Sequence, residues 1–147
     1  MSQRNKKKKI KSIFIMFVLL IIIGGAVFFF FNINSRAEEE NDFYLTEDTF
    51  VIEGIYGRTY NLSDIEGIRI INSTPELGAK LNGMGFGSIR KGKYRVEGYG
   101  ECNVYLYTNR KCIHISVIDD DDILINFESE SQTLYLYNKL REEIAQL

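Results

Sequence analysis

The sequence predicts a mainly β domain that ends in one C-terminal α-helix and follows one N-terminal transmembrane helix. Three observations lead to this fold class. Residues 12–33 contain no charged residue, and about 20 such residues suffice to cross a bilayer as a helix. Between residues 50 and 127, short segments rich in Ile, Val, Tyr and Phe alternate with turn residues, which is typical of strands. From Ser129 onward, apolar residues recur at helical spacing.

The residues that flank the predicted span give its orientation. Residues 1–11 carry six basic residues and no acidic one, whereas residues 38–42 carry four acidic ones. Because positive residues beside a span stay in the cytoplasm, we expect a single-pass plasma-membrane protein with its N-terminus in the cytoplasm and its C-terminal domain outside. The alternative is a secretory signal that is cleaved near Ala37. Both interpretations export the domain.

This interpretation divides the chain into a short basic cytoplasmic tail (residues 1–11), a transmembrane helix in the lipid bilayer (12–33), an acidic stalk (34–48) and one domain (49–147). Residues 38–147 contain 11 basic and 20 acidic residues, so the outer part is strongly acidic although the whole chain has a net charge of −2. An acidic surface repels polyanions. We therefore expect no nucleic acid among its partners.

Seven short strands are expected in the domain. Gly54 and Gly57 permit a tight reversal between the first two strands. Asp119–Asp122 precedes the last strand, where four adjacent carboxylates suggest calcium; a solvated hairpin turn is the favoured interpretation because adjacent side chains point apart and the EF-hand spacing is missing. The predicted strands are Phe50–Glu53, Arg58–Leu62, Ile65–Ile71, Ile89–Glu97, Asn103–Thr108, Cys112–Ile118 and Ile123–Phe127.

Seven glycines lie between residues 78 and 100. A phosphate-binding loop is one interpretation, but neither Gly-Lys-Ser/Thr nor a helical pattern follows these glycines. We favour the other interpretation, in which they form bulges and bends in strands that curve.

The two cysteines are expected to stay unpaired. If Asn109-Arg110 is a two-residue turn, the strands on either side of it pair directly and Tyr107 faces Cys112. Cys102 and Cys112 then lie several residues apart and on opposite faces, beyond the reach of a disulfide. Together with His114, they offer too few ligands at these spacings for a metal site.

An amphipathic helix is predicted from residue 129 to the C-terminus. Ser129 and Gln132 have the spacing of a capping box. The apolar stripe of this helix should face the strands, and it comprises Thr133, Leu136, Tyr137, Leu140, Ile144 and Leu147.

Parts of the sequence resemble the bacterial pleckstrin-homology-like families. The resemblance covers residues 50–146 and runs through Tyr60–Ile65, the glycines at 83, 85 and 92, Val104–Tyr107, Ile113–Ile115 and the C-terminal helix. It implies a PH-like, seven-stranded orthogonal β-sandwich or barrel that the helix caps. It carries no catalytic residue and no cofactor. In place of the basic cluster that binds phosphoinositides in eukaryotic relatives stands Arg58 alone, so no phosphoinositide ligand is expected.

The leading functional hypothesis is a membrane-anchored binding or assembly module, not an enzyme, that contacts another protein or the cell envelope outside the cell. Its expected binding residues are Lys91, Lys93 and Arg95, a basic cluster on one face of a strand in an acidic domain. The alternative for these residues is an edge strand that its cations keep from pairing. A ligand-sensing subunit of a membrane complex and a carboxylate-dependent hydrolase also remain open.

Overall fold

The computed structural model describes residues 13–29 and 41–147. The chain divides into two compact units, residues 1–37 and residues 38–147. The first unit contains an α-helix over residues 13–29, whose side chains are exposed. Within the described residues, no helix combines the length and the apolar character that are needed to cross a bilayer. The predicted tail, positions 12 and 30–33 of the predicted span, and positions 34–40 of the predicted stalk lie outside the described residues.

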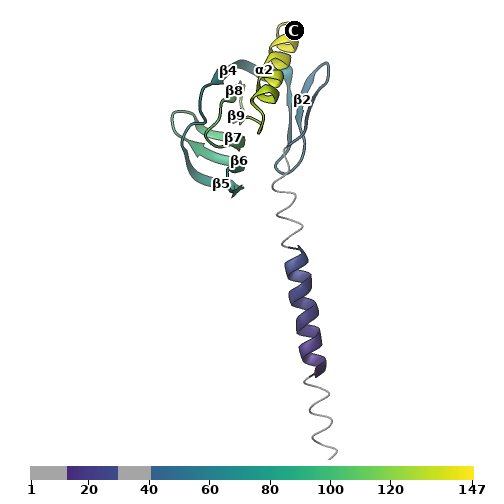
Figure 1. Ribbon diagram of the computed structural model, residues 1–147. Helices are drawn as coiled ribbons and strands as arrows, with labels where there is room; N and C mark the ends of the chain where they lie inside the picture. Colours follow the sequence, from purple (N-terminus) through teal and green to yellow (C-terminus); the bar gives the residue numbers. More distant parts are fainter. Residues whose placement is uncertain (1–12, 30–40) are drawn as a thin grey trace, which may run out of the picture. The chain divides into compact units, whose positions relative to one another are not determined.

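The described part of the second unit contains nine strands, a 3₁₀ turn and one helix (Figure 1). The strands are β1 (Phe43–Leu45), β2 (Thr49–Ile52), β3 (Arg58–Asn61), β4 (Ile65–Ile71), β5 (Leu77–Phe86), β6 (Ile89–Val96), β7 (Gly100–Tyr107), β8 (Cys112–Val117) and β9 (Asp122–Ile125). The turn is η1 (Leu62–Asp64) and the helix is α2 (Glu130–Ile144). The prediction of a mainly β domain with one C-terminal helix is confirmed.

The prediction of seven strands is wrong because β1 and β5 are additional. β1 lies inside the segment assigned to the stalk, where Phe43 pairs with Ile52 of β2 and its ring lies 5.2 Å from that of Phe127. β5 lies in the glycine-rich segment, where glycine hides the strand pattern. Its pairing with β6 has register shifts between Leu77 and Asn82, which confirms the expectation of bulges there.

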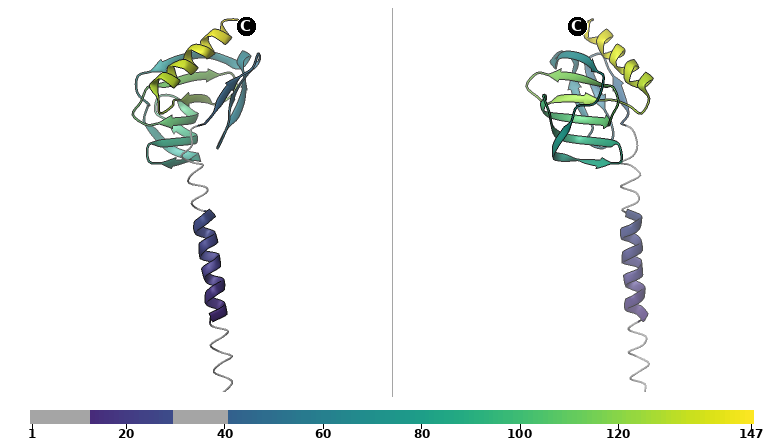
Figure 2. Two further views of the ribbon diagram at one scale, coloured as in Figure 1. Left: turned by 45° about the vertical axis from the view of Figure 1, so that its right-hand side comes forward. Right: turned by 60° about the vertical axis from the view of Figure 1, so that its left-hand side comes forward.

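The strands form two sheets. The smaller has the order β1-β2-β3, and the larger has the order β4-β8-β9-β7-β6-β5. Within the larger sheet, β9 is antiparallel to β8 and parallel to β7. Figures 1 and 2 show α2 beside β4 and β8 toward one end of this sheet, with β5 at the other end.

The central position of β9 overturns the predicted direct pairing of β7 with β8. Leu124 of β9 pairs with His114 on one side and with Val104 on the other, and laterally paired residues share a face. Cys102 and Cys112 therefore lie on the same face, in one apolar cluster with Leu124, and their predicted placement on opposite faces is wrong. Both are buried free thiols.

The main apolar core joins both sheets to α2, and a smaller cluster covers the other face of the larger sheet. A fully buried Leu or Ile side chain contributes about 1.5–3 kcal/mol, so the main core dominates the stability of the fold. Its fully buried members are Phe50, Ile52, Leu62, Ile113, Ile115, Ile123, Ile125, Leu136 and Leu140.

The helix α2 buries Thr133, Leu136 and Leu140 of the predicted stripe, and Tyr137 and Ile144 pack against the main core. The prediction is wrong at Leu147, which is 69% exposed because the helix already ends at Ile144. The predicted capping box does not form: Ser129 is the N-cap but makes no side-chain capping hydrogen bond, and its hydroxyl lies 2.6 Å from that of Ser131. The Thr133 hydroxyl instead accepts a hydrogen bond of 3.0 Å from the backbone N–H of Phe127. This bond ties the first turn of the helix to the segment that follows β9.

Candidate functional site

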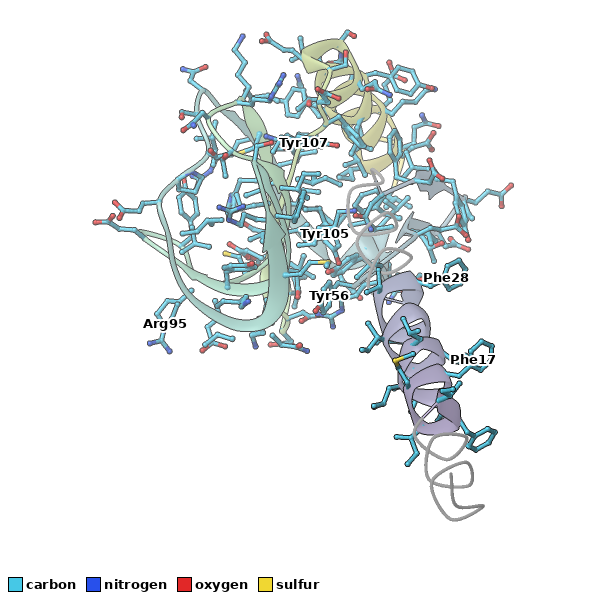
Figure 3. All side chains as sticks on the ribbon, turned by 60° about the horizontal axis from the view of Figure 1, so that its bottom comes forward. Phe17, Phe28, Tyr56, Arg95, Tyr105 and Tyr107 are labelled. Carbon is cyan, nitrogen blue, oxygen red and sulfur yellow. The ribbon has the colours of Figure 1, made fainter. Side chains whose placement is uncertain are left out.

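The three predicted binding residues lie on one face of β6, but they differ in how far they are exposed to solvent. Lys91 is 4% exposed, Lys93 is half-buried and Arg95 is exposed. Figure 3 shows Arg95 pointing away from the body of the domain. Because β6 lies between β5 and β7, it is not an edge strand. The interpretation that these cations keep an edge strand from pairing is therefore wrong.

Carboxylates contact the two more exposed cations. Lys93 Nζ lies 2.8 Å from Glu101 Oε2 and 2.9 Å from Asp121 Oδ2, while Arg95 Nη2 lies 3.4 Å from Glu101 Oε1. The hydrogen bonds to Glu101 and Asp121 raise the pKa of Lys93, and the same contact with Lys93 lowers the pKa of Glu101. The positive charges of Lys93 and Arg95 are therefore balanced locally by β7 and by the turn after β8.

Lys93 also lines a polar groove, and we define this hollow as the candidate site. It encloses about 470 Å³, which falls in the range of about 300–1,000 Å³ typical of ligand pockets. The loop between β2 and β3, the strands β3, β5, β6 and β7, and the turn between β8 and β9 supply its lining. These residues are Tyr56, Gly57, Arg58, Asn82, Gly92, Lys93, Asn103, Asp120 and Asp121.

The β2–β3 loop forms one wall of the groove, and residues outside the loop hold it by hydrogen bonds. Tyr105 Oη donates a hydrogen bond of 2.5 Å to the carbonyl of Tyr56, and Figure 3 shows the two residues close together. Asn41 Nδ2 donates to the carbonyls of Glu53 and Ile55. At Gly57, a Cβ would lie 2.4 Å from the carbonyl oxygen of Ile52, so only glycine fits. The wall is therefore fixed by contacts from outside the loop.

Two ion pairs lie in the walls of the groove. Arg58 Nη2 lies 2.9 Å from Asp120 Oδ2, and Lys93 contacts Asp121 as described above. Asp122, the last of the four consecutive acids, instead lies 2.7 Å from Nε2 of the buried His114. The carboxylates of this turn thus point to different partners, and the described residues contain no group of three or more metal-ligating side chains.

Asn103 lies in the groove lining with an unmade hydrogen bond. Its side chain is 6% exposed, and within the described residues its Nδ2 has no hydrogen-bond partner. A buried donor left unpaired costs about 1–3 kcal/mol, so such a group is unusual unless something else bonds to it. Asn103 pairs laterally with Lys93 of β6 and with Ile123 of β9, which places it in the middle of the sheet.

A family model described as a bacterial PH domain matches residues 41–126, more than half of the chain. The chain belongs to the bacterial PH domain family. The match begins at Asn41, which holds the groove wall, and extends through β9. It confirms the family resemblance seen in the sequence. Neither a comparison with curated proteins nor one with solved structures gives a match.

The sequence resemblance led us to expect Arg58 alone beside the loop that binds phosphoinositides in eukaryotic relatives. Arg58 is the first residue of β3, and its guanidinium makes two contacts with Asp120, at 2.9 and 3.4 Å. The guanidinium also lies 5.5 Å from the centre of the Tyr60 ring. A phosphate ligand would have to displace a carboxylate from this arginine.

The two cysteines and the histidine of the PH domain are buried, and none of them lines the groove. Burial raises the pKa of the Cys102 and Cys112 thiols to about 12, and a thiol reacts as its thiolate. His114 is 4% exposed and packs against Tyr99, with 4.9 Å between ring centres. These groups belong to the packing of the larger sheet.

Sequence reasoning found Lys93 but missed the rest of the groove. Asn82, Asn103 and Tyr56 carry no motif that marks them as site residues, because their proximity arises from the order of strands in the sheet. The one usable signal was Asp119–Asp122, two of whose members do line the groove.

Proposed function

We propose that this protein is a membrane-anchored binding module whose PH domain lies outside the cell and contacts another protein through the polar groove. The observation that carries the proposal is Asn103, a buried side chain in the groove lining whose Nδ2 has no hydrogen-bond partner among the described residues. The Nδ2 atom has less than 1 Å² of accessible surface, so a partner bonds to it when the Asn103 side chain turns toward the groove. A polar group supplied there removes the penalty of the unmade bond. The free energy of binding then includes that gain.

The groove is suited to a polar partner of mixed charge. Arg58 and Asp120 present one cation and one anion, and Lys93 and Asp121 present another such pair. All four side chains retain contact with solvent, so they can exchange their present partners for those of a ligand at little cost. Peptide groups and charged side chains of a protein segment offer the donors and acceptors that this lining requires.

The membrane anchor is residues 12–33. It is supported by the helix over residues 13–29, whose apolar side chains are exposed all along its length, since such a helix needs apolar surroundings. The basic residues at 1–11 support a cytoplasmic N-terminus. In the alternative, cleavage near Ala37 releases the same PH domain.

Site-specific crosslinking in living cells tests the groove. A photo-reactive amino acid replaces Asn82 in the full-length protein, and the same amino acid at Tyr135, an exposed residue of α2, is the matched control. We expect a discrete crosslinked product from position 82 that is absent from position 135. The product should be lost when Asn103→Leu is added.

Two results would contradict the proposal: equal products from both positions, or a product from position 82 that Asn103→Leu leaves unchanged. Protease added to intact cells tests the orientation separately. Digestion should remove the PH domain and leave the N-terminal residues protected; complete protection of the PH domain would refute its placement outside.

A further inference from the structure

The strand β5 leaves one side of its backbone open. It is the last strand of the larger sheet, and among the described residues it pairs with β6 alone. With ten residues it is the longest of the described strands. Figure 2 shows it at the border of the sheet, away from α2. An uncovered edge of this length presents a row of unpaired backbone N–H and C=O groups.

The second half of this edge is regular and uncharged. The register shifts lie between Leu77 and Asn82, and from Asn82 to Phe86 each residue has a successive partner on β6. Tyr94 Oη donates a hydrogen bond of 2.7 Å to the carbonyl of Met84, which holds this half against the sheet. Natural edges are usually blunted by charges, bulges or proline, and Asn82–Phe86 has none of these.

Cations flank the uncharged half. The β5–β6 hairpin, residues 77–96, contains five basic residues and no acidic one in an otherwise acidic domain. Lys80 stands before the regular half and makes no ion pair among the described residues. Arg90 of β6 pairs with Gly85 near the other end of the regular half, its side chain lies against that glycine, and its guanidinium donates to the carbonyls of Gly87 and Ile89. The positive charge of Lys80 and Arg90 is thus not balanced by a described carboxylate.

The geometry points to β5 as the docking edge for an extended segment of another protein, a segment that adds to the larger sheet as a further strand and carries acidic residues at its ends. Backbone hydrogen bonds to Leu81 and to Asn82–Phe86 supply the affinity, and Lys80 and Arg90 select the acidic ends. This inference rests on the proposed function, since it names the chemistry of the protein partner. A second copy of this chain fits less well, because it brings the same basic hairpin to the contact.

Leu81 offers a variant that blocks the edge alone. It stands between Lys80 and Asn82 at a register shift and has no partner residue on β6, so Leu81→Pro removes an N–H without breaking the pairing of β5 with β6. Leu81→Ala removes the side chain and keeps the N–H, and is the matched control. Lys80→Glu, at an exposed position, reverses a flanking charge and serves as a second variant should the proline hinder folding.

The experiment uses the full-length protein in detergent micelles and a labelled peptide of alternating Thr and Val with two Glu at each end. The control peptide has Lys in place of Glu. We expect the acidic peptide to bind at least about ten-fold more tightly than the basic one at low salt. Leu81→Pro should weaken its binding about ten-fold, the equivalent of one lost hydrogen bond, while Leu81→Ala should change it less than about two-fold. Lys80→Glu should reduce or reverse the preference between the peptides.

The outcomes separate the edge from the groove. Loss of binding in Leu81→Pro but not in Asn103→Leu supports the edge, whatever the fate of the groove. Loss in Asn103→Leu alone assigns the peptide to the groove and overturns the edge proposal. Equal binding of both peptides, no binding of either, or a concentration-dependent dimer that Leu81→Pro dissociates would each overturn it as well.

Discussion

Replacing Asn103 by Leu should make the PH domain more stable, although the residue lines the candidate binding groove. Its side chain is 6% exposed and its Nδ2 has no partner among the described residues. An unpaired buried donor costs about 1–3 kcal/mol, and an apolar side chain of similar size removes that cost. Part of the gain is lost because Leu has a different shape from Asn. We expect a net stabilisation of about 1 kcal/mol.

Asn126 is the matched control, because it is an equally buried asparagine with its hydrogen bonds made. It is 4% exposed. Its Oδ1 accepts from the N–H of Tyr107 at 2.6 Å, and its Nδ2 donates to the carbonyls of Tyr107 at 2.9 Å and of Lys111 at 3.0 Å. Asn126→Leu removes these three hydrogen bonds from a buried site, and we expect it to cost about 3 kcal/mol or more.

Urea unfolding of the full-length protein in detergent micelles measures both effects. Tyrosine fluorescence reports the PH domain alone, because all nine tyrosines lie at or after residue 44 and the chain has no tryptophan. With a slope of about 1–3 kcal/mol per molar urea, the midpoint should rise by about 0.5 M for Asn103→Leu and fall by at least about 1 M for Asn126→Leu. If both variants lower the midpoint to the same extent, Asn103 is satisfied in the free protein and the case for the groove is lost.

Three further predictions concern the sheet, the thiols and the anchor. Gly92→Ala should cost about 3 kcal/mol, since φ is +106° and a Cβ would lie 2.4 Å from the carbonyl oxygen of Asn82; Gly98→Ala, with φ +78° and open space, should cost only about 1 kcal/mol in the same urea assay. Cys102 and Cys112 should resist alkylation at pH 8 until urea unfolds the domain. Fast alkylation of the folded protein would contradict this burial. Because burial raises the pKa of both thiols from 9.0 to about 12, the thiols of the unfolded chain ionise at lower pH, and the free energy of unfolding should fall as the pH rises between these two values. Leu20→Arg should move the protein out of the membrane fraction, at a cost of about 3 kcal/mol for a mid-span charge, whereas Leu20→Ile should not; unchanged fractionation of both would argue against the anchor.

Local patterns in the sequence were sufficient for the fold class and for most strands. Alternating apolar residues identify β8, a short apolar run identifies β9, and the helical spacing after Ser129 identifies α2 with its buried Leu136 and Leu140. These signals depend on which side chains each segment buries, and burial is written into the composition of the segment itself.

The order of strands was not available from such patterns. Asn109-Arg110 does join β7 to β8, yet β9 lies between them, because pairing is decided by the packing of the whole sheet. Because of this error in pairing, the two thiols were predicted on opposite faces of the sheet, whereas they lie on the same face. β5 was hidden for a different reason: three of its ten residues are glycine, which weakens any strand pattern.

The candidate site was the least predictable part. The predicted binding residues Lys91, Lys93 and Arg95 were chosen for their charge, but Lys91 is buried. Its burial follows from its pairing with Tyr105 and from the packing of the whole domain. Asn103 carries no sequence signal at all. Its importance comes from a hydrogen bond that is not made, and that is a property of three-dimensional surroundings.

The central place of β9 has a consequence for how the chain reaches its final form. The hairpin of β5 with β6 and its neighbour β7 forms one group of strands, β4 with β8 forms another, and residues 122–125 join the two. A chain that is made from its N-terminus therefore lacks β9, the strand that joins the two groups, until almost the whole domain has been synthesised. Such a late, long-range closure is slow. Under the proposed export of the PH domain, slow folding would be an advantage, because a segment that folded early would obstruct its own passage across the membrane.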